Sequence, residues 1–164
     1  MADALDAPFD RYRARVLPEW IDENGHLNMG YYVVVFDKAT DEWLDYIGLT
    51  QAFKDAHDVT TFSVESHVTY QRELRGGDPL RFTTQLLGFD AKRMHYAHEM
   101  YHADEGFLAS TNELMSFHVS NETRRSAPMA PEIQARLAEI QKAHEKLPIP
   151  SYVGRVIGLK AKRA

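Results

Sequence analysis

A polar loop directly before a long amphipathic segment carries the clearest chemical pattern in the sequence. The string Trp20-Ile21-Asp22-Glu23-Asn24-Gly25-His26-Leu27-Asn28-Met29 ends where a helix is predicted to begin. The first backbone N–H groups of a helix lack internal partners, and the helix dipole adds positive potential there, so they can bind a developing oxyanion. A carboxylate beside them, such as Asp22, can act as a base or a nucleophile. These two elements are what hydrolysis of an activated acyl group needs.

The same residues also have structural alternatives. Asp22 is a typical turn residue, and Asn28 is a typical helix cap. Three roles stay open for His26: positioning the substrate, holding Asp22, or capping the turn. Asn28 either faces an acyl pocket or does nothing beyond capping the helix.

The loop is one of several motifs that occur together. The sequence contains Asp22-x-x-Gly25-His26-x-Asn28, then Tyr31-Tyr32, then Tyr70, then Gly77-Asp78-x-Leu80. From about residue 10 to 120 this set resembles the hotdog-fold acyl-CoA thioesterases of the 4-hydroxybenzoyl-CoA type. The resemblance implies thioester cleavage, with Asp22 as the catalytic carboxylate and a backbone N–H near Met29 as the oxyanion donor. It further implies a homodimer or homotetramer with its active site at the subunit interface, CoA bound on the surface as part of the substrate, and no separate cofactor.

A longer string is similar to one branch of that family, the betainyl-CoA thioesterases of carnitine and betaine breakdown. It reads Glu19-Trp20-Ile21-Asp22-x-Asn24-Gly25-His26. Such an enzyme would bind a cationic acyl group, which aromatic faces and nearby acids attract. Residues 1–60 carry 12 acidic and 5 basic side chains. The candidate aromatic residues are Trp20, Tyr31, Tyr32 and Trp43, although Tyr32 and Trp43 also fit the core-facing stripe of the helix.

Further candidate residues lie outside the loop. Glu65 and His67 are two apart on a predicted strand and so share a face, which either lines the pocket or is sheet surface. The basic residues proposed to hold the CoA phosphates are Arg72, Arg75, Lys92 and Arg93, and the sequence ends in a basic stretch that includes Lys160, Lys162 and Arg163.

Several kinds of site are excluded or disfavoured. There are no cysteines, so a thiolate nucleophile, a cysteine-ligated metal and a disulfide are ruled out. His98 and His102 would share a strand face but stand about 13 Å apart, while His95 would face the other way, so no metal site is predicted. A Gly-x-Ser-x-Gly elbow and the Gly-rich nucleotide-binding loops are missing. The remaining alternatives are a hotdog hydratase or dehydratase with His26 as base, a non-catalytic acyl-CoA-binding module, and a purely structural scaffold dimer.

The helices and strands that position the loop are predicted from the spacing of hydrophobic residues, which changes along the chain. Residues 8–21 alternate as a strand does, and 29–47 repeat as a helix whose core-facing stripe includes Met29, Tyr32, Val33, Phe36 and Trp43. Four strands joined by short turns are predicted at 60–70, 80–87, 93–102 and 107–119, which favours an antiparallel meander. A helix at 131–145 and a loop or tail at 147–164 complete the chain.

One α+β domain over residues 1–164 is therefore predicted, with a core from about 8 to 120. An antiparallel sheet curled around one long central helix, plus a short C-terminal helix, is the hotdog architecture. The outer face and edges of such a sheet would still need cover, which favours a homodimer. No apolar run is long enough for a bilayer and no secretory signal is recognisable, so a cytoplasmic protein with no membrane partner is expected. The acidic front half argues against nucleic acid.

Overall fold

Five antiparallel strands form one sheet within residues 5–159, the part of the chain that this computed structural model describes. They are β1 (Arg13–Arg15), β2 (Val59–Tyr70), β3 (Pro79–Phe89), β4 (Arg93–His102) and β5 (Leu108–Ser120). Their order across the sheet is β1-β3-β4-β5-β2. The four strands predicted after the long helix are confirmed to within two residues at each end. Together with three helices they make the α+β, curled-sheet hotdog fold that the sequence predicts.

The predicted meander holds for β3, β4 and β5 but is wrong for β2. Strand β2 pairs with β5 at the far edge of the sheet and not with β3, the next strand in the chain. Residues 71–78 therefore cross the end of the sheet, and the Leu27 N–H donates to the Leu74 carbonyl at 2.7 Å on the way. This crossing carries Arg72 and Glu73 to the beginning of the long helix.

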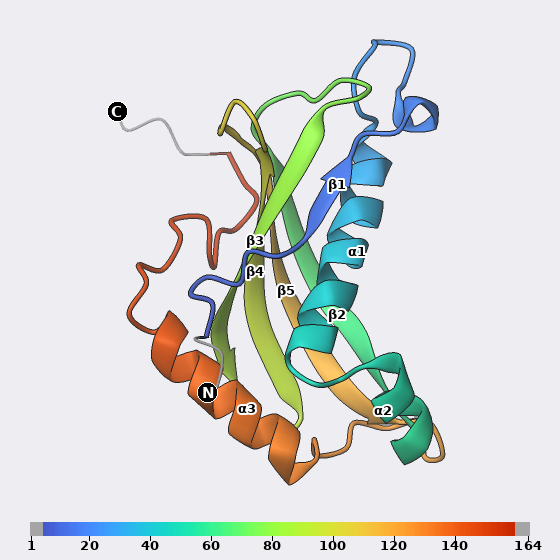
Figure 1. Ribbon diagram of the computed structural model, residues 1–164, viewed down its shortest axis with the longest axis vertical. Helices are drawn as coiled ribbons and strands as arrows, with labels where there is room; N and C mark the ends of the chain where they lie inside the picture. Colours follow the sequence, from blue (N-terminus) through green and yellow to red (C-terminus); the bar gives the residue numbers. More distant parts are fainter. Residues whose placement is uncertain (1–4, 160–164) are drawn as a thin grey trace.

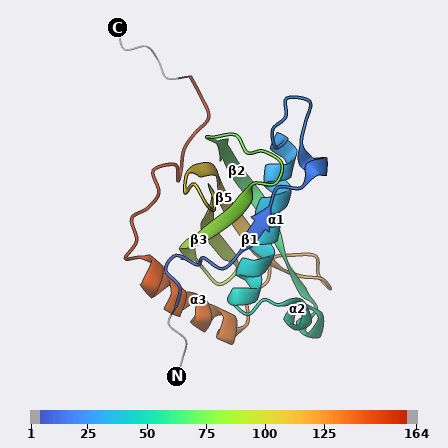
Figure 2. The same ribbon diagram turned by 45° about the horizontal axis from the view of Figure 1, so that its top comes forward.

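Helix α1 (Met29–Tyr46) lies along one face of the sheet (Figures 1 and 2). The Asn28 side chain caps it by accepting the Gly30 N–H at 2.9 Å. Gly48, with φ at +97°, ends it in a conformation that side chains rarely adopt. The residues of α1 buried against the sheet are Tyr32, Val35, Phe36, Ala39, Thr40, Trp43 and Leu44.

The predicted core stripe of α1 is wrong at its first turns. Met29 is 68% exposed and Val33 is 45% exposed, whereas Val35 and Ala39 are buried. The buried positions are 32 and then the pairs 35–36, 39–40 and 43–44, so the buried stripe is turned slightly away from 29 and 33. Met29 and Val33 consequently stand on the flank of the helix.

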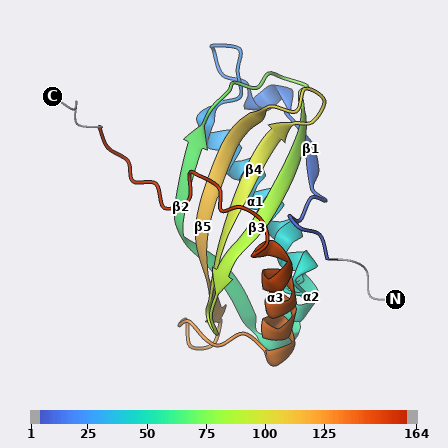
Figure 3. The ribbon, with the colours of Figure 1, turned by 90° about the vertical axis from the view of Figure 1, so that its left-hand side faces the viewer.

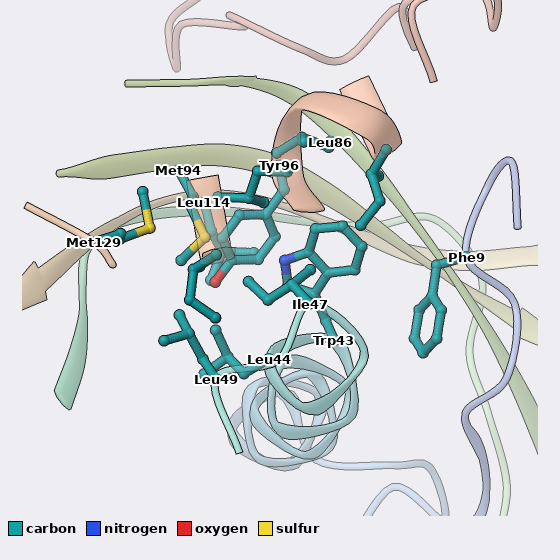
Figure 4. Close-up of a cluster of buried hydrophobic side chains, with 13 residues drawn as sticks. Phe9, Trp43, Leu44, Ile47, Leu49, Leu86, Met94, Tyr96, Leu114 and Met129 are labelled. Carbon is teal, nitrogen blue, oxygen red and sulfur yellow. The ribbon is translucent and has the colours of Figure 1, made fainter. Parts of the chain in front are cut away.

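Two side-chain clusters form the core. One centres on Trp43 and joins the end of α1 to β3, β4, β5 and helix α3 (Pro131–His144), as Figure 4 shows for Trp43, Tyr96 and their neighbours. The other, around Phe36, includes Leu27 and Leu74. The second cluster fixes the loop before α1 to the crossing segment, because both of those leucines are almost fully buried.

The predicted extended stretch 8–21 is only partly a strand. β1 pairs with β3 over three residues, Phe9 makes an isolated bridge to Thr84, and Pro18–Trp20 form a short 3-10 turn. The proline explains the turn, since its fixed φ suits the start of a helical turn. The short helix α2 (Gln51–His57), capped by Thr50, was not predicted.

Helix α3 covers the part of the β3 edge that β1 does not reach. Its His144 accepts the Leu86 N–H at 2.8 Å through Nδ1, and Nε2 faces the Asp6 carbonyl at 2.8 Å. Burial lowers the pKa of His144, which keeps it neutral for this double role. The Leu86 N–H at this edge of β3 is thereby hydrogen-bonded without another strand.

The segment after α3 crosses the face of the sheet opposite α1 (Figure 3). It contains turns but neither helix nor strand as far as residue 159, and the Gly154 N–H donates to the Glu113 carboxylate at 2.8 Å. The basic residues Lys160, Lys162 and Arg163 lie outside the described residues. No helix among residues 5–159 is long and apolar enough to span a membrane.

Candidate active site

The loop before α1 is folded tightly enough to fix the position of Asp22. Its backbone N–H donates to the His26 carbonyl and its own carbonyl accepts the Gly25 N–H, both at 3.0 Å. Gly25 has φ at +79°, which the turn requires and which glycine adopts at no steric cost. The Asp22 carboxylate accepts one N–H, from Asn24 at 2.9 Å, and otherwise faces the pocket described below.

The beginning of α1 leaves one donor unused. Gly30 donates to the Asn28 side chain and Tyr31 donates to the Asn28 carbonyl. The Met29 N–H has no hydrogen-bond partner among residues 5–159. A free N–H at the positive end of a helix of 18 residues is a ready oxyanion donor.

Both features face one open pocket of about 510 Å³. Asn28 thus combines the two roles that the sequence left open, because it caps α1 and also borders this pocket. The residues that line the pocket come from the loop, the first turn of α1, the end of β2 and the crossing segment: Asp22, Leu27, Asn28, Met29, Tyr32, Tyr70, Gln71, Arg72 and Glu73.

Two tyrosines form one wall of the pocket. The rings of Tyr32 and Tyr70 meet edge to face, with centroids 5.2 Å apart and planes at 84°. The Tyr32 hydroxyl donates to the Arg72 carbonyl and the Tyr70 hydroxyl to the Met29 carbonyl, each at 3.4 Å. Burial raises the pKa of Tyr32 to about 12 and also raises the pKa of Tyr70, so both hydroxyls stay protonated.

The other predicted aromatic residues are not in this wall. Trp20 and Tyr31 stack on each other, with centroids 5.7 Å apart, beside the loop and outside the pocket lining. Trp43 is completely buried in the core cluster. Tyr70 takes their place; the sequence marked it as a motif residue but gave no sign that it would meet Tyr32.

His26 points toward the crossing segment and not into the pocket. Its Nε2 lies 3.1 Å from the Glu73 carboxylate, which is also 3.6 Å from Arg75. His26 is absent from the pocket lining, whereas Glu73 belongs to it. The chain therefore brings His26 to Glu73, and the predicted catalytic role of His26 stays a prediction. Nothing local in the sequence indicated Glu73, since only the crossing segment brings it here.

Within one chain, Glu65 and His67 do not line the pocket with Asp22, so of their two interpretations the structure favours sheet surface. Both lie on the opposite face of the sheet, where they border a separate cavity of about 330 Å³ with His95 and Glu113. The register of β2 shifts between Ser63 and Glu65, so the residues after this irregularity alternate in the opposite sense from those before it. Without that shift Glu65 and His67 would share the face of Ser63.

The four predicted phosphate-binding residues divide into two pairs. Arg72 and Arg75 border a polar cavity of about 630 Å³ next to the site, where the Arg72 guanidinium lies 3.8 Å from the centroid of the Phe107 ring. Lys92 and Arg93 lie in the turn between β3 and β4, at the other end of those strands. Arg93 is paired there with Asp90. Within one chain, this second pair does not join the site.

The remaining histidines do not form a metal centre. No group of His, Asp and Glu within residues 5–159 has metal-binding geometry. His98 is fully buried between the hydroxyls of Thr40 and Thr84, at 3.0 and 2.8 Å. Burial lowers the pKa of His98 to about 3, so it is a neutral core residue.

Comparisons with known proteins identify the family of the chain. Betainyl-CoA thioesterase of Pseudomonas aeruginosa is 43% identical, over 90% of this chain and 93% of that protein. The L-carnitine dehydrogenase/betainyl-CoA thioesterase of Rhizobium meliloti is 33% identical over 96% of this chain, which spans 32% of that longer protein. A hypothetical protein of Staphylococcus aureus, solved in complex with CoA, has a TM-score of 0.88 at 27% identity, over 98% of this chain and 100% of that one.

The family assignment covers the loop, α1 and the whole of the sheet apart from its first residues. Residues 16–137 match the thioesterase-like superfamily, a span that contains the pocket and both of its chemical features. The chain therefore belongs to the thioesterase-like superfamily.

Proposed function

We propose that this acyl-CoA thioesterase acts on a small cationic acyl group, with betainyl-CoA as the substrate to test first, and releases the free acid and CoA. The observation that carries the proposal is one pocket holding both the Asp22 carboxylate and the unpartnered Met29 N–H. Two relatives with betainyl-CoA thioesterase in their names, at 43% and 33% identity, support the choice of acyl group.

The reaction can follow either of two routes from Asp22. In the first, a carboxylate oxygen attacks the thioester carbonyl carbon, the C–S bond breaks, and the CoA thiolate leaves and takes up a proton. Water then hydrolyses the mixed anhydride and restores Asp22. In the second route Asp22 removes a proton from water as that water attacks the carbonyl carbon. The C–S bond then breaks, and the CoA thiolate leaves and takes up the proton that Asp22 held. In both, the Met29 N–H stabilises the negative charge on the carbonyl oxygen.

The surroundings of the pocket support a cationic group. Asp22 and Glu73 supply negative charge at the lining, and the Tyr32–Tyr70 wall supplies aromatic surface. We assign the CoA phosphates to Arg72 and Arg75, which border the adjoining polar cavity. The reaction as proposed uses the CoA of its substrate and needs no separate cofactor.

A second copy of the chain is proposed to cover the open side of the site. Strand β2 has no partner on its outer edge among the described residues, and such an edge invites pairing. Apolar side chains are exposed next to it, with Met29 at 68%, Val64 at 56% and Val33 at 45%. Sedimentation equilibrium should therefore give a dimer or tetramer, and Val64→Lys should shift it toward monomer. A monomeric wild type would refute this part of the proposal.

Thiol release from a panel of acyl-CoA esters tests the proposal as a whole. The panel contains betainyl, short aliphatic, long-chain and aromatic acyl groups, assayed with wild type, Asp22→Asn and the exposed-carboxylate control Asp104→Asn. We expect the highest kcat/KM for betainyl-CoA, and its loss in Asp22→Asn alone. A different best substrate would overturn the proposed acyl group. Full activity in Asp22→Asn would overturn the assignment of Asp22 to the active site.

A single turnover in water enriched in ¹⁸O tests for the anhydride route. Label that enters the Asp22 side chain, detected by mass spectrometry of the peptide, requires the mixed anhydride. Label found in the free acid alone is the result expected of the water route, and it restricts any anhydride route to one in which water attacks the acyl carbon.

A further inference from the structure

We infer that Tyr70, backed by Tyr32, forms the surface that binds the quaternary ammonium of the acyl group and selects it over a neutral group of the same shape. The inference rests on the proposed function, and it assigns acyl specificity to a residue that the loop motif does not contain. Tyr70 is the last residue of β2 and borders the pocket beside the first turn of α1.

The position of Tyr70 matches the position that the cation must take. In a betainyl thioester a single methylene separates the nitrogen from the carbonyl carbon. The ammonium must therefore lie beside the oxyanion donor, the Met29 N–H. The Tyr70 hydroxyl is 3.4 Å from the Met29 carbonyl, and Tyr70 and Met29 line the same pocket, which brings this side chain within reach of the ammonium. Trp20, Tyr31 and Trp43 do not line the pocket.

The Tyr70 ring is held in place and still has an open face. An edge-to-face pair covers at most one face of either ring, and Tyr70 remains 47% exposed. Its contact with Tyr32, which is 4% exposed, and its hydroxyl bond to α1 restrain the ring before substrate arrives. A preformed aromatic face binds a cation with little loss of side-chain freedom.

The charges around the pocket favour a cation over an anion. Asp22 and Glu73 contribute carboxylates to the lining. The one basic lining residue, Arg72, has its guanidinium over the Phe107 ring, 3.8 Å from the centroid. Both tyrosine hydroxyls stay neutral because burial raises their pKa values, so the attraction of this wall comes from the ring faces.

The test compares betainyl-CoA with 3,3-dimethylbutanoyl-CoA, in which carbon replaces the charged nitrogen and the shape is kept. Wild type, Tyr70→Phe and Tyr70→Leu are assayed on both thioesters. Phe62→Leu is the matched control, since Phe62 is on the same strand, is 44% exposed and does not line the pocket. We expect wild type, Tyr70→Phe and Phe62→Leu to share one preference for the cation, and Tyr70→Leu to reduce that preference about tenfold.

The outcomes separate this inference from the proposed function. If wild type hydrolyses betainyl-CoA and Tyr70→Leu slows both thioesters equally, the function stands and the inference is wrong. If wild type does not prefer betainyl-CoA to its neutral isostere, the proposed acyl group fails as well. Phenylalanines with increasing fluorine content at position 70 provide a second measurement that keeps the ring in place. The preference should fall stepwise with fluorination, and a constant preference would overturn the inference.

Discussion

The two faces of the sheet each carry a cavity with carboxylates close to histidine, yet only one of them has the features of a catalytic site. On the α1 side, the Asp22 carboxylate accepts a single local N–H and shares its pocket with the free N–H of Met29. On the other face, Glu113 is held by His95 at 2.8 Å and by the Gly154 N–H at 2.8 Å. Its hydrogen bonds fasten the C-terminal segment to the sheet.

This difference shows that residue types alone do not make a site. Carboxylates and histidine occur in both places, with Glu65, Glu113, His67 and His95 around the outer cavity and Asp22, Glu73 and His26 near the pocket on the α1 side. What distinguishes the α1 side is an unsatisfied backbone donor beside an accessible carboxylate, and a helix end supplies such a donor as a matter of geometry. The outer cavity lies over β4 and β5, which are paired on both sides, so their N–H groups are used in the sheet.

The largest expected effect is the loss of the Asp22 carboxylate, compared with the loss of Glu113 on the other face. Asp22→Asn should lower kcat on the best thioester by about 10²- to 10⁴-fold, since it removes the base or nucleophile. Glu113→Gln should leave kcat within about threefold of wild type. Initial rates of thiol release measure both. Equal losses in the two variants would mean that the outer face takes part in the chemistry.

The oxyanion donor can be removed without changing the side-chain chemistry of the site. Met29→Pro deletes the N–H at the first position of α1, where proline is well tolerated, and Asn28 already has the extended backbone that precedes a proline. We expect kcat to fall by about 10²- to 10³-fold, the cost of one oxyanion donor.

Met29→Ala, which keeps the N–H, is the control and should retain most of the activity. Circular dichroism should show the same helix content in both variants. Full turnover by a folded Met29→Pro enzyme would place the oxyanion donor elsewhere.

The buried histidine that lines neither cavity, His98, should affect stability and not catalysis. Burial holds the pKa of His98 at about 3, below its unfolded value of about 6.5, so the unfolded chain binds more protons between these values. Its contribution to stability is present above about pH 6.5 and is lost as the pH falls. From pH 7 to pH 5 it should cost about 2 kcal/mol of unfolding free energy.

Urea denaturation at the two pH values, with His98→Gln for comparison, measures that contribution. The variant should lose less stability on acidification than wild type, because its side chain does not titrate. An identical acid loss in both proteins would show that His98 is protonated in the folded state or is not the group responsible.

The smallest effect is expected at His26. Because it contacts Glu73 at 3.1 Å and does not line the pocket, His26→Ala should change kcat/KM by about tenfold or less. The change should come mainly through KM for the cationic substrate, with kcat nearly constant. A loss as large as that of Asp22→Asn would make His26 a catalytic residue and would revive a hydratase-like role for it.

Many of the helices and strands that position the site were predictable from local sequence. The hydrophobic repeat of α1, its cap at Asn28 and its stop at Gly48 involve residues within a few positions of one another, and these set the two ends of the helix. The strands β2 to β5 follow from their composition and from the turns between them. The pairing of β2 with β5 does not, because it joins residues about 50 positions apart and depends on how segment 71–78 crosses the sheet.

The sequence by itself therefore determined the long helix, the strands and the Asp22 loop before the helix, because capping, turn chemistry and hydrophobic period act over a few residues. The tertiary structure alone decided which side chains join that loop. It brought Tyr70 and Glu73 to the pocket, buried Trp43, and turned Glu65 and His67 to the other face through one irregularity in β2. Strand register and loop crossing are set by contacts between distant residues, and no local pattern encodes them.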